Sequence, residues 1–595
     1  MIRLIRMKKK FERAKLTDID LKLLALNAKG YVLPSVLAPL FVIVEVVMEV
    51  LIPMEMGRLV DEGIAVGNMN AVWTHGGIML AYALAALISG ALSARFAAVA
   101  SMGFAKNLRA SMFEKIQHFS FGNVDKFSTG SLVTRMTTDV TFIRNAYTTM
   151  IRIAFRAPLM FAMSIAVAID INWKIALIFI AVVPILAVAM VAAALIAFPL
   201  FRKMFKRFDK MNTVVQENLI GIRVVKAFVK EDHETQKFRD AAEGVRKTQV
   251  SAEKLLAYGQ PAMQLVMFLC LVAVVWFGGR QIILGTGTMT MGDLASFITY
   301  VNQILMSLLM VAMIFVNVVL SSASAARVSE VLKEKPEITD ESATTDEQPK
   351  DGSIEFADVS FGYQKSEKPV IEGMNLSIAS GETVGIVGGT GSAKSTLVQL
   401  IPRLYDVSAG EIRVGGLPVK NYTIKNLRSA VSMVLQKNVL FSGTIRDNLK
   451  WGDENATDEE LIAACRTAAA DFVESFPEGL DTDLGQGGVN LSGGQKQRLC
   501  IARAVLKKPK IMILDDSTSA VDSATDRHIR SELKEKLQGM TVLIIAQRIS
   551  SVKDADKILV LHDGKIIGEG AHSDLYRTCS EYRNICDLQN VGEVV

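Results

Sequence analysis

Hydrophobic residues are concentrated in the first half of the chain, in long stretches with few charges. A helix needs about 20 mostly apolar residues to cross a bilayer. The run 157–169 reaches that length when it is extended back to Asn145, with Arg152 and Arg156 facing the protein interior. The pattern predicts six membrane-spanning helices, near residues 31–57, 76–100, 145–169, 175–201, 255–279 and 294–326.

The pattern changes after Ala326. Residues 328–352 are charged and polar, with no apolar face after Leu332, and predict a linker. From Ser353 onward, short β-rich runs alternate with amphipathic helical segments, which predicts an α/β domain with a largely parallel sheet over 353–595. We therefore expect an N-terminal segment with an elbow helix (1–30), an α-helical six-span transmembrane domain (31–327), the linker and the α/β domain.

Composition and charge narrow the class of protein. Half of the 595 residues are hydrophobic and 21% are charged, so an ordinary soluble protein and a disordered chain are both excluded. The net charge of +5 is small for this length and gives no indication of a nucleic-acid partner. Basic residues gather in Met1–Lys15 and in the long connections 103–144 and 202–254. We therefore expect a multi-pass protein of the plasma membrane. By the positive-inside rule, these segments and both termini lie in the cytoplasm.

A phosphate-binding loop is predicted where a strand, a glycine-rich turn and a helix follow one another. The strand TVGIVG leads into a loop made of Gly388, Gly389, Thr390, Gly391, Ser392, Ala393, Lys394, Ser395 and Thr396. Backbone N–H groups and a helix N-terminus would surround phosphates, Lys394 would neutralise them, and a Ser395 or Thr396 hydroxyl would reach Mg²⁺. The usual pattern has glycine where this chain has Ala393, and the added methyl restricts the backbone and crowds the phosphates.

Two further segments carry chemistry that suits a nucleotide. An apolar strand ends in Asp515, whose carboxylate is placed to bind Mg²⁺ through water. Between this strand and the loop lies the segment Leu491, Ser492, Gly493, Gly494 and Gln495. Ser-Gly-Gly at the start of a helix offers an anion a hydroxyl and N–H groups, although by itself the segment could equally be a plain helix cap.

With these motifs the chain resembles the ABC transporter family, specifically exporters with six spans ahead of the nucleotide-binding domain. The resemblance implies ATP and Mg²⁺ as cofactors. It implies that Tyr363 stacks on adenine, that Gln436 joins the Mg²⁺ site to the membrane part, and that Ser519–Asp522 forms the loop between two sites. It also implies that Leu491–Gln495 is the signature that closes over ATP held by a partner domain. Segments 124–140 and 217–228 resemble the cytoplasmic loops that dock on nucleotide domains.

Three departures from the family pattern concern catalysis. Asp516 stands where the family places a catalytic Glu, Gln547 where it places the switch His, and Gln486 where the loop before the signature usually has Glu. The Asp516 carboxylate would lie roughly 1–1.5 Å from the position that a water-activating base needs, which can cost about 100-fold in rate. Gln547 can donate a hydrogen bond but cannot become cationic. We expect ATP on this chain's own loop to be hydrolysed slowly or not at all.

This pattern resembles the degenerate subunit of heterodimeric exporters. It implies a second, different half-subunit with an intact Glu and His, whose site this chain's signature completes; a homodimer would have two impaired sites. The leading hypothesis is ATP-driven export of small lipophilic molecules such as drugs. The alternatives are a lipid or peptide exporter half, and an ATP-gated channel or sensor with weak hydrolysis.

The sequence says little about cargo. Glu45 and Glu49 lie four residues apart on one face of the first span, and ionisable residues inside a membrane often face a cavity. They are candidates for contact with a cationic lipophilic substrate, or for pairing with Arg152 or Arg156. Met306, Met310 and Met313 share one face of the last span, a stripe that is more typical of packing.

Overall fold

The computed structural model describes residues 20–285, 289–363, 368–516, 521–536 and 539–589. The chain forms two compact units. Unit 1 takes in the described residues of Met1–Gln117 together with Gly130–Glu334, and unit 2 takes in His118–Thr129 together with the described residues of Lys335–Val595. Helices in the first unit and an α/β arrangement in the second confirm the predicted fold class.

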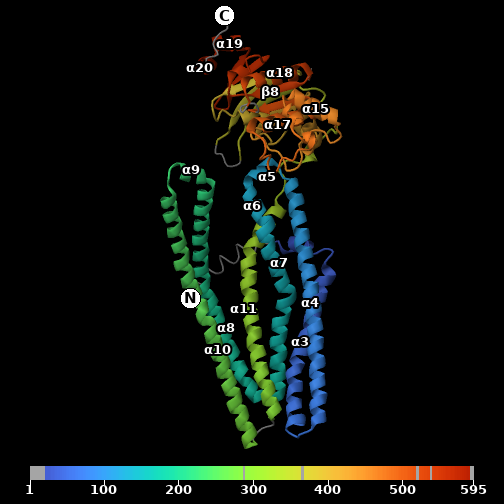
Figure 1. Ribbon diagram of the computed structural model, residues 1–595, viewed down its shortest axis with the longest axis vertical. Coiled ribbons are helices and arrows are strands. Elements are labelled where there is room, and N and C mark those ends of the chain that lie inside the picture. Colours follow the sequence, from blue (N-terminus) through green and yellow to red (C-terminus); the bar gives the residue numbers. More distant parts are fainter. Residues whose placement is uncertain (1–19, 286–288, 364–367, 517–520, 537–538, 590–595) are drawn as a thin grey trace. The chain divides into compact units, whose positions relative to one another are not determined.

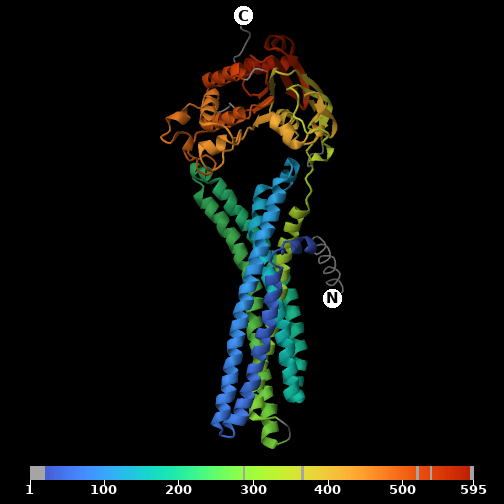
Figure 2. The ribbon, with the colours of Figure 1, turned by 90° about the vertical axis from the view of Figure 1, so that its right-hand side faces the viewer.

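Unit 1 is built from long helices that run alongside one another (Figure 1). Its elements are α2 (Leu21–Leu26), α3 (Val32–Arg58), η1 (Leu59–Ile64), α4 (Met69–Gln117), α6 (Thr129–Thr134, whose first residue belongs to unit 2), η2 (Arg135–Asp139), α7 (Val140–Thr148), η3 (Thr149–Ile153), α8 (Ala154–Ile220), α9 (Ile222–Ala227), α10 (Glu231–Leu284) and α11 (Met291–Lys333). The segments η1, η2 and η3 are π-helical turns. In two views α8 and α10 run side by side as far as the short helix α9 (Figures 1 and 2).

The long helix α8 contains a break that separates two of the predicted spans. Asn172 has the non-helical angles φ −156° and ψ 99°. Its side-chain oxygen accepts a hydrogen bond from the N–H of Ile175 at 3.2 Å, as an N-cap residue does, and its amide donates to Gln281 of α10 at 2.9 Å. Among the described residues, five helical segments are long and apolar enough to cross a membrane, and one of them, Thr129–Leu186, runs through this break.

Unit 1 keeps much apolar surface uncovered. On α4, Leu80, Leu87 and Ile88 are 62%, 68% and 59% exposed. Helix α11 also makes a polar contact with α3, since the Tyr300 hydroxyl donates to the carbonyl of Val50 at 2.8 Å. Exposed apolar faces of this extent suit a helix bundle that is surrounded by lipid or by another chain.

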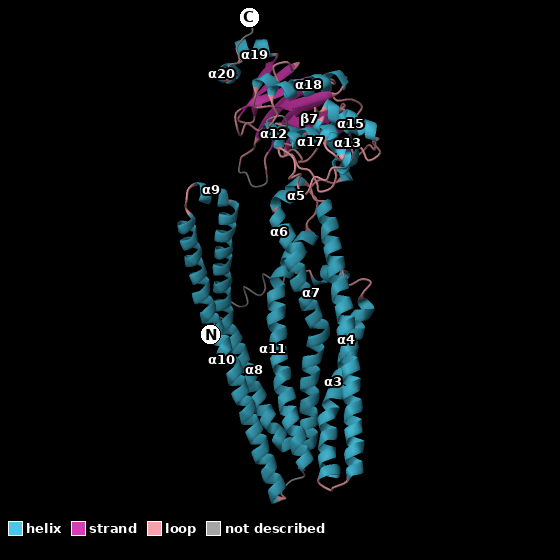
Figure 3. Cartoon of the chain, viewed as in Figure 1, coloured by secondary structure: helices cyan, strands magenta, loops and turns pink. Residues whose placement is uncertain are grey.

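Unit 2 contains two sheets with helices around them (Figure 3). Its strands are β1 (Ile354–Phe361), β2 (Ile371–Ile378), β3 (Thr383–Gly388), β4 (Ala409–Val414), β5 (Leu417–Pro418), β6 (Val431–Val434), β7 (Ile511–Asp515), β8 (Thr541–Ile545), β9 (Lys557–His562) and β10 (Lys565–Gly570). Its helices are α5 (Phe121–Lys126), η4 (Asp340–Ser342), α12 (Lys394–Leu400), η5 (Val419–Asn421), α13 (Ile424–Ala430), α14 (Ile445–Leu449), α15 (Asp458–Thr467), α16 (Phe472–Ser475), η6 (Gly479–Asp481), α17 (Gly493–Leu506), α18 (Ser523–Lys536), η7 (Ile549–Ser551), α19 (His572–Thr578) and α20 (Ser580–Leu588).

The larger sheet positions the candidate site. Its strand order is β10-β9-β3-β8-β7-β6, and the five strands from β9 to β6 are parallel, while β10 pairs antiparallel at the edge. The smaller sheet, β2-β1-β4-β5, is antiparallel. Because parallel strands end at the same edge, the loops after β3, β8, β7 and β6 gather at one place.

Residues predicted to form a linker at 328–352 are part of the two units instead. Helix α11 continues to Lys333. Beyond it, the Thr344 N–H donates to the carbonyl of Asn421 at 2.8 Å, and the Arg403 guanidinium contacts the carbonyl of Thr339. The polar composition of this stretch therefore reflects surface chain that hydrogen-bonds to unit 2.

Candidate functional site

The glycine-rich loop joins β3 to α12 as the sequence predicts. Gly388 has φ +151°, and a Cβ built there would lie 2.2 Å from the carbonyl oxygen of Leu561, so the position accepts only glycine without a shift. Lys394 is the first residue of α12, and its ammonium donates to the carbonyls of Gly388 at 2.9 Å and Gly389 at 2.7 Å. The cation is thus held at the loop that phosphates would occupy. Burial lowers the pKa of Lys394, partly offset by Asp515 and Asp516.

Ala393 adopts a backbone conformation that favours glycine. Its φ is +72° and it lies at the N-cap of α12. The residue is 8% exposed and belongs to an apolar cluster with Leu397 and Ile386. The restriction expected from the methyl therefore acts through backbone strain, and burial of the methyl in this cluster does not support crowding of the phosphates.

A hydroxyl and a carboxylate meet at the predicted Mg²⁺ position. The Ser395 hydroxyl donates to Oδ1 of Asp515 at 3.0 Å. Asp515 is 3% exposed, and burial raises its pKa, which the hydrogen bond from Ser395 partly offsets. Thr396 is used differently, because its hydroxyl pairs with that of Tyr363 at 3.0 Å. Ser395 is therefore the hydroxyl placed for the metal, and two hard oxygen donors suit Mg²⁺.

The residues at the two altered catalytic positions contact each other. Gln547, which follows β8, donates from Nε2 to Oδ2 of Asp516 at 3.0 Å, and Gln436, which follows β6, also hydrogen-bonds to Asp516. Asp516 follows β7 with φ +49°, and burial raises its pKa despite these bonds. The structure thus brings all three residues together at the sheet edge, and the Asp516 carboxylate is engaged by two amides.

The aromatic residue predicted to stack on adenine belongs to a cluster. Tyr363 makes edge-to-face contacts with Phe361, at 5.0 Å between ring centroids, and with Tyr405, at 5.3 Å. The Tyr405 hydroxyl donates to Asp125 of α5 at 2.7 Å. Sequence reasoning missed Tyr405, because nothing in its surroundings along the chain marks it as a contact of α5.

The signature segment caps a helix. Ser492 is the N-cap of α17, and Gln495 completes a capping box with it: the Ser492 N–H donates to Gln495 Oε1 at 2.8 Å, and the Gln495 N–H donates to Ser492 Oγ at 3.3 Å. Leu491 is buried beneath, while Ser492 and Gly493 are exposed. The plain capping role is therefore present, and the helix N-terminus remains accessible on the surface of unit 2.

The structure describes only the second half of the segment Ser519–Asp522, which is predicted to form the loop between two ATP sites. Ser519 and Ala520 lie outside the described residues. Asp522 accepts hydrogen bonds from the N–H groups of Ala524 and Thr525, at 3.1 and 3.0 Å, where α18 begins. The backbone bond from Thr525 holds the pKa of Asp522 below its usual value. Gln486 is exposed ahead of α17.

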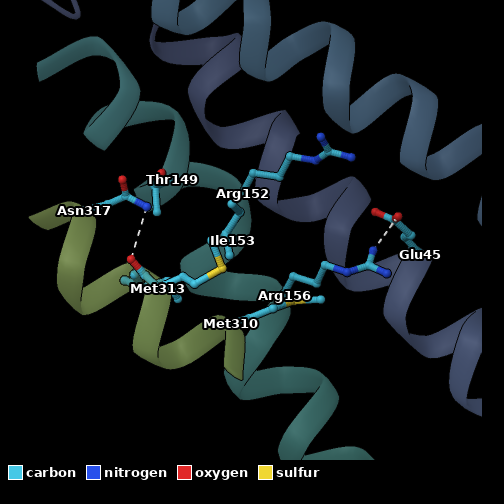
Figure 4. Close-up of a pocket in the computed structure, with 9 residues that line it drawn as sticks. Glu45, Thr149, Arg152, Ile153, Arg156, Met310, Met313 and Asn317 are labelled. Atoms are coloured by element: carbon cyan, nitrogen blue, oxygen red, sulfur yellow. Dashed lines mark hydrogen bonds and ion pairs between the residues drawn. The ribbon is translucent and has the colours of Figure 1, made fainter. Parts of the chain in front are cut away.

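In unit 1, both membrane carboxylates bind the same arginine. Arg156 donates to Glu45 Oε1 at 2.5 Å (Figure 4). It also donates to both oxygens of Glu49 at 2.8 Å. This is the pairing with Arg156 that the sequence predicts as an alternative to contact with cargo. A cavity of about 350 Å³ lies beside this ion pair and is lined by Glu45, Arg152 and Arg156 together with residues of η3 and α11.

These features define the class of protein: a multi-span membrane domain fused to a phosphate-loop, nucleotide-binding domain. Residues 35–308 match the model of the ABC transporter transmembrane region, and residues 371–519 match that of the ABC transporter domain. The uncharacterized ABC transporter ATP-binding protein YfiB of Bacillus subtilis (strain 168) is 36% identical over 562 residues, which are 94% of this chain and 97% of that protein. The chain belongs to the ABC transporter family and has the architecture of an exporter half.

Other similar proteins support the same assignment. An ATP-dependent lipid A-core flippase of Desulfotalea psychrophila (strain LSv54 / DSM 12343) is 34% identical over 459 residues, which are 77% of this chain and 80% of that protein. A solved structure of a bacterial Atm1-family ABC exporter with ATP bound has a TM-score of 0.81 and 25% identity. It covers 95% of this chain, which in turn covers 100% of that one. The protein is thus a multi-pass membrane ATPase that uses ATP and Mg²⁺.

Proposed function

We propose that this chain is the degenerate half of a heterodimeric exporter that moves small lipophilic molecules across the plasma membrane. The observation that carries the proposal is the hydrogen bond between Gln547 and Asp516. A general base needs a free carboxylate within reach of the attacking water, and here the shortened carboxylate is bound by amides. Gln547 cannot supply the positive charge that a histidine could place beside a phosphate.

The surface of unit 2 fits the second part of the proposal. Ser492 and Gly493 are exposed at the start of α17, where a hydroxyl and backbone N–H groups can stabilise an anion presented by another chain. The partner is then a different half-subunit that carries the intact Glu and His. With both termini in the cytoplasm, the nucleotide domains of the two halves would close on ATP and drive the membrane helices.

A second candidate function is lipid flipping. Relatives that match most of this chain are named ATP-dependent lipid A-core flippases. The same ATP site would serve either cargo, so the two candidates differ in what the membrane domain binds.

The ATPase activity of this chain purified alone tests the degenerate site. We expect turnover about 100-fold below that of the assembled heterodimer, because each site of a homodimer would lack a placed base. As a control, the double variant Asp516→Glu with Gln547→His should raise the activity of the isolated chain. Vigorous turnover by the unaltered chain alone would refute the assignment of Asp516 and Gln547 as degenerate.

A further inference from the structure

The cavity beside Glu45 contains a guanidinium group that no described residue satisfies. Arg152 and Arg156 both extend from the helical segment η3–α8 toward α3, and Met310 and Met313 approach from α11 on the other side (Figure 4). Arg156 is paired with Glu45 and Glu49. Arg152, by contrast, makes no hydrogen bond or ion pair with the part of the chain that the structure describes, although it is half-buried.

The carboxylates of this cavity are not available to a ligand. Glu45 is 8% exposed, and its Oε2 atom is buried without a hydrogen-bond partner. The carboxylate packs on Gly90 of α4, where an added Cβ would lie 2.8 Å from Oε1. Glu49 gives both of its oxygens to Arg156. Glu45 therefore packs against α4 and Arg156, and Glu49 is bound by Arg156. The charged group of the cavity that is left for a ligand is the Arg152 guanidinium.

The position of Arg152 in its helix is unusual. It lies in the π-helical turn η3, which also supplies Thr149 and Ile153 to the cavity. Single π-helical turns inside long helices are frequent at functional sites, because the extra residue redirects side chains. An arginine within a membrane helix is costly unless it meets a partner or a water-filled cavity, so an unpaired one marks a site for cargo or ions.

The opposite wall of the cavity, on α11, consists of Met310, Met313 and Ile314 together with one polar residue, Asn317, and is therefore mostly apolar. Met313 is 64% exposed and Met310 lies one turn before it on α11. Thioether side chains reshape easily around irregular apolar groups. A volume of about 350 Å³ is at the lower end for a small-molecule pocket and suits a head group with the first part of an apolar chain.

We propose that this cavity binds the anionic end of an amphiphile, with a carboxylate or phosphate on Arg152 and an apolar chain against Met310 and Met313. The planar guanidinium fork matches both anions in bidentate geometry. The inference rests on the proposed export function, because the cavity serves as a cargo site only in a transporter. It differs from the cationic cargo that the sequence offers as one of the candidate roles of Glu45 and Glu49.

Binding to the full chain in phosphatidylcholine nanodiscs, without ATP, tests the proposal. The probes are 11-(dansylamino)undecanoic acid, its uncharged methyl ester, and a dansylated alkylamine of the same length. The acid should bind about 10-fold more tightly than the ester, as one charge-assisted hydrogen-bonded pair implies, and the amine should bind no better than the ester. Equal binding of acid and ester, or a preference for the amine, would overturn the proposal without involving any variant.

Variants then locate the site. Arg152→Gln should weaken binding of the acid about 10-fold and leave the ester unchanged. Arg152→Lys keeps the charge but loses the planar fork, so its affinity for the acid should lie between those of the unaltered chain and Arg152→Gln. Arg95→Gln is a matched control, since it removes the same charge from an exposed position on α4. An acid affinity that stays within about twofold in Arg152→Gln would show that the anion binds elsewhere.

Competition distinguishes the sources of the anion. Dodecyl phosphate and dodecanoate should each displace the acid, and inorganic phosphate at the same concentration should not, because the apolar wall contributes to binding. If inorganic phosphate displaced the acid as well as the two amphiphiles do, the cavity would bind simple anions without using its apolar wall. That result would contradict the proposal. Because binding needs no ATP, a failure here leaves the ATPase test of the degenerate site unaffected, and a failure there leaves this one standing.

Discussion

Ala393 shows how a single methyl alters the phosphate loop. A residue other than glycine at φ +72° costs roughly 1–2 kcal/mol. Against this, glycine loses about 0.5–1 kcal/mol more backbone entropy on folding, and the buried methyl contributes about 0.8 kcal/mol. The three effects nearly cancel, which explains how the chain tolerates alanine here.

We therefore predict that Ala393→Gly changes the stability of unit 2 by less than about 1 kcal/mol. Ala393→Val should be harmful, because a β-branched residue in the left-handed region costs a further ~1–3 kcal/mol. Thermal unfolding of the purified chain, followed by a probe in unit 2, measures both changes. An unfolding temperature for Ala393→Val equal to that of the unaltered chain would show that the strain lies elsewhere.

At the residue scale, the sequence predicts which residues gather but not how they bond. The loop, Asp515, Asp516, Gln436 and Gln547 follow strand ends, and parallel strands bring those ends together. Sequence periodicity does not encode the directions of side chains. It therefore does not predict that Ser395 rather than Thr396 contacts Asp515, or that Gln547 donates to Asp516. Arg152 and Arg156 look alike in the sequence, and only the structure separates the paired arginine from the other.

Among the elements, α3 and α8 are joined through a partly buried charge cluster of Glu45, Glu49 and Arg156. Arg156→Gln would leave Glu45 and Glu49 without their shared partner, and removing one member of a buried ion pair typically costs about 3–5 kcal/mol. We expect a large fall in the thermal stability of the detergent-solubilised chain.

The triple variant Glu45→Gln, Glu49→Gln and Arg156→Gln serves as the control for this prediction. It removes all the charges at once and should recover most of the stability lost in Arg156→Gln, because no buried charge is left unpaired. If Arg156→Gln alone were as stable as the unaltered chain, the cluster would not hold α3 against α8.

The short helix α5 depends on its contacts with the rest of unit 2 for its position. With six residues it is too short to be stable by itself. Asn123 donates to the carbonyl of Lys335 at 3.0 Å, the ring of Phe121 meets that of Tyr405 edge-on at 5.9 Å, and Tyr405 donates to Asp125. Burial raises the pKa of Tyr405 and its bond to Asp125 adds to this effect, so the hydroxyl stays a donor.

We predict that Tyr405→Phe increases amide hydrogen exchange in α5 about 2- to 10-fold, the effect of losing one hydrogen bond. Tyr422→Phe is the matched control: it also removes a tyrosine hydroxyl bond in unit 2, to the carbonyl of Val414, but does not touch α5. Exchange in α5 that responds equally to both variants would mean a general loosening of unit 2.

Elements were more predictable than their details. The strand and helix alternation after Ser353 follows from local patterning, and Asn172 breaks α8 between the predicted spans 145–169 and 175–201. The π-helical turns η1, η2 and η3 leave the hydrophobic period nearly unchanged over five or six residues, so sequence patterns do not reveal them. The polar composition after Lys333 predicts a linker. Sequence patterns do not show that backbone groups of this stretch, such as the N–H of Thr344, hydrogen-bond to unit 2.

At the scale of the whole molecule, two features of unit 2 belong to different ATP sites in the proposed heterodimer. Asp516 and Gln547 act on the ATP bound by this chain's own loop, whereas Ser492 and Gly493 act on ATP bound by the partner. The sequence predicts this division of roles, because its signature is intact while the residues at the catalytic positions are altered. In the proposed heterodimer, each ATP site needs residues of both chains.

Steady-state ATPase of the assembled heterodimer, compared between two variants of this chain, tests the central claim most directly. In the proposed heterodimer Asp516 does not act as the base for turnover, so Asp516→Ala should lower turnover by no more than a few-fold. Ser492→Ala with Gly493→Asp removes a hydroxyl and introduces an anion beside the partner's γ-phosphate. Turnover and transport should then fall by about 100-fold or more, the scale of losing one donor to a transition-state anion. Nucleotide binding at Lys394 should persist in both variants. The reverse ranking, with Asp516→Ala inactive and the signature variant active, would contradict the account.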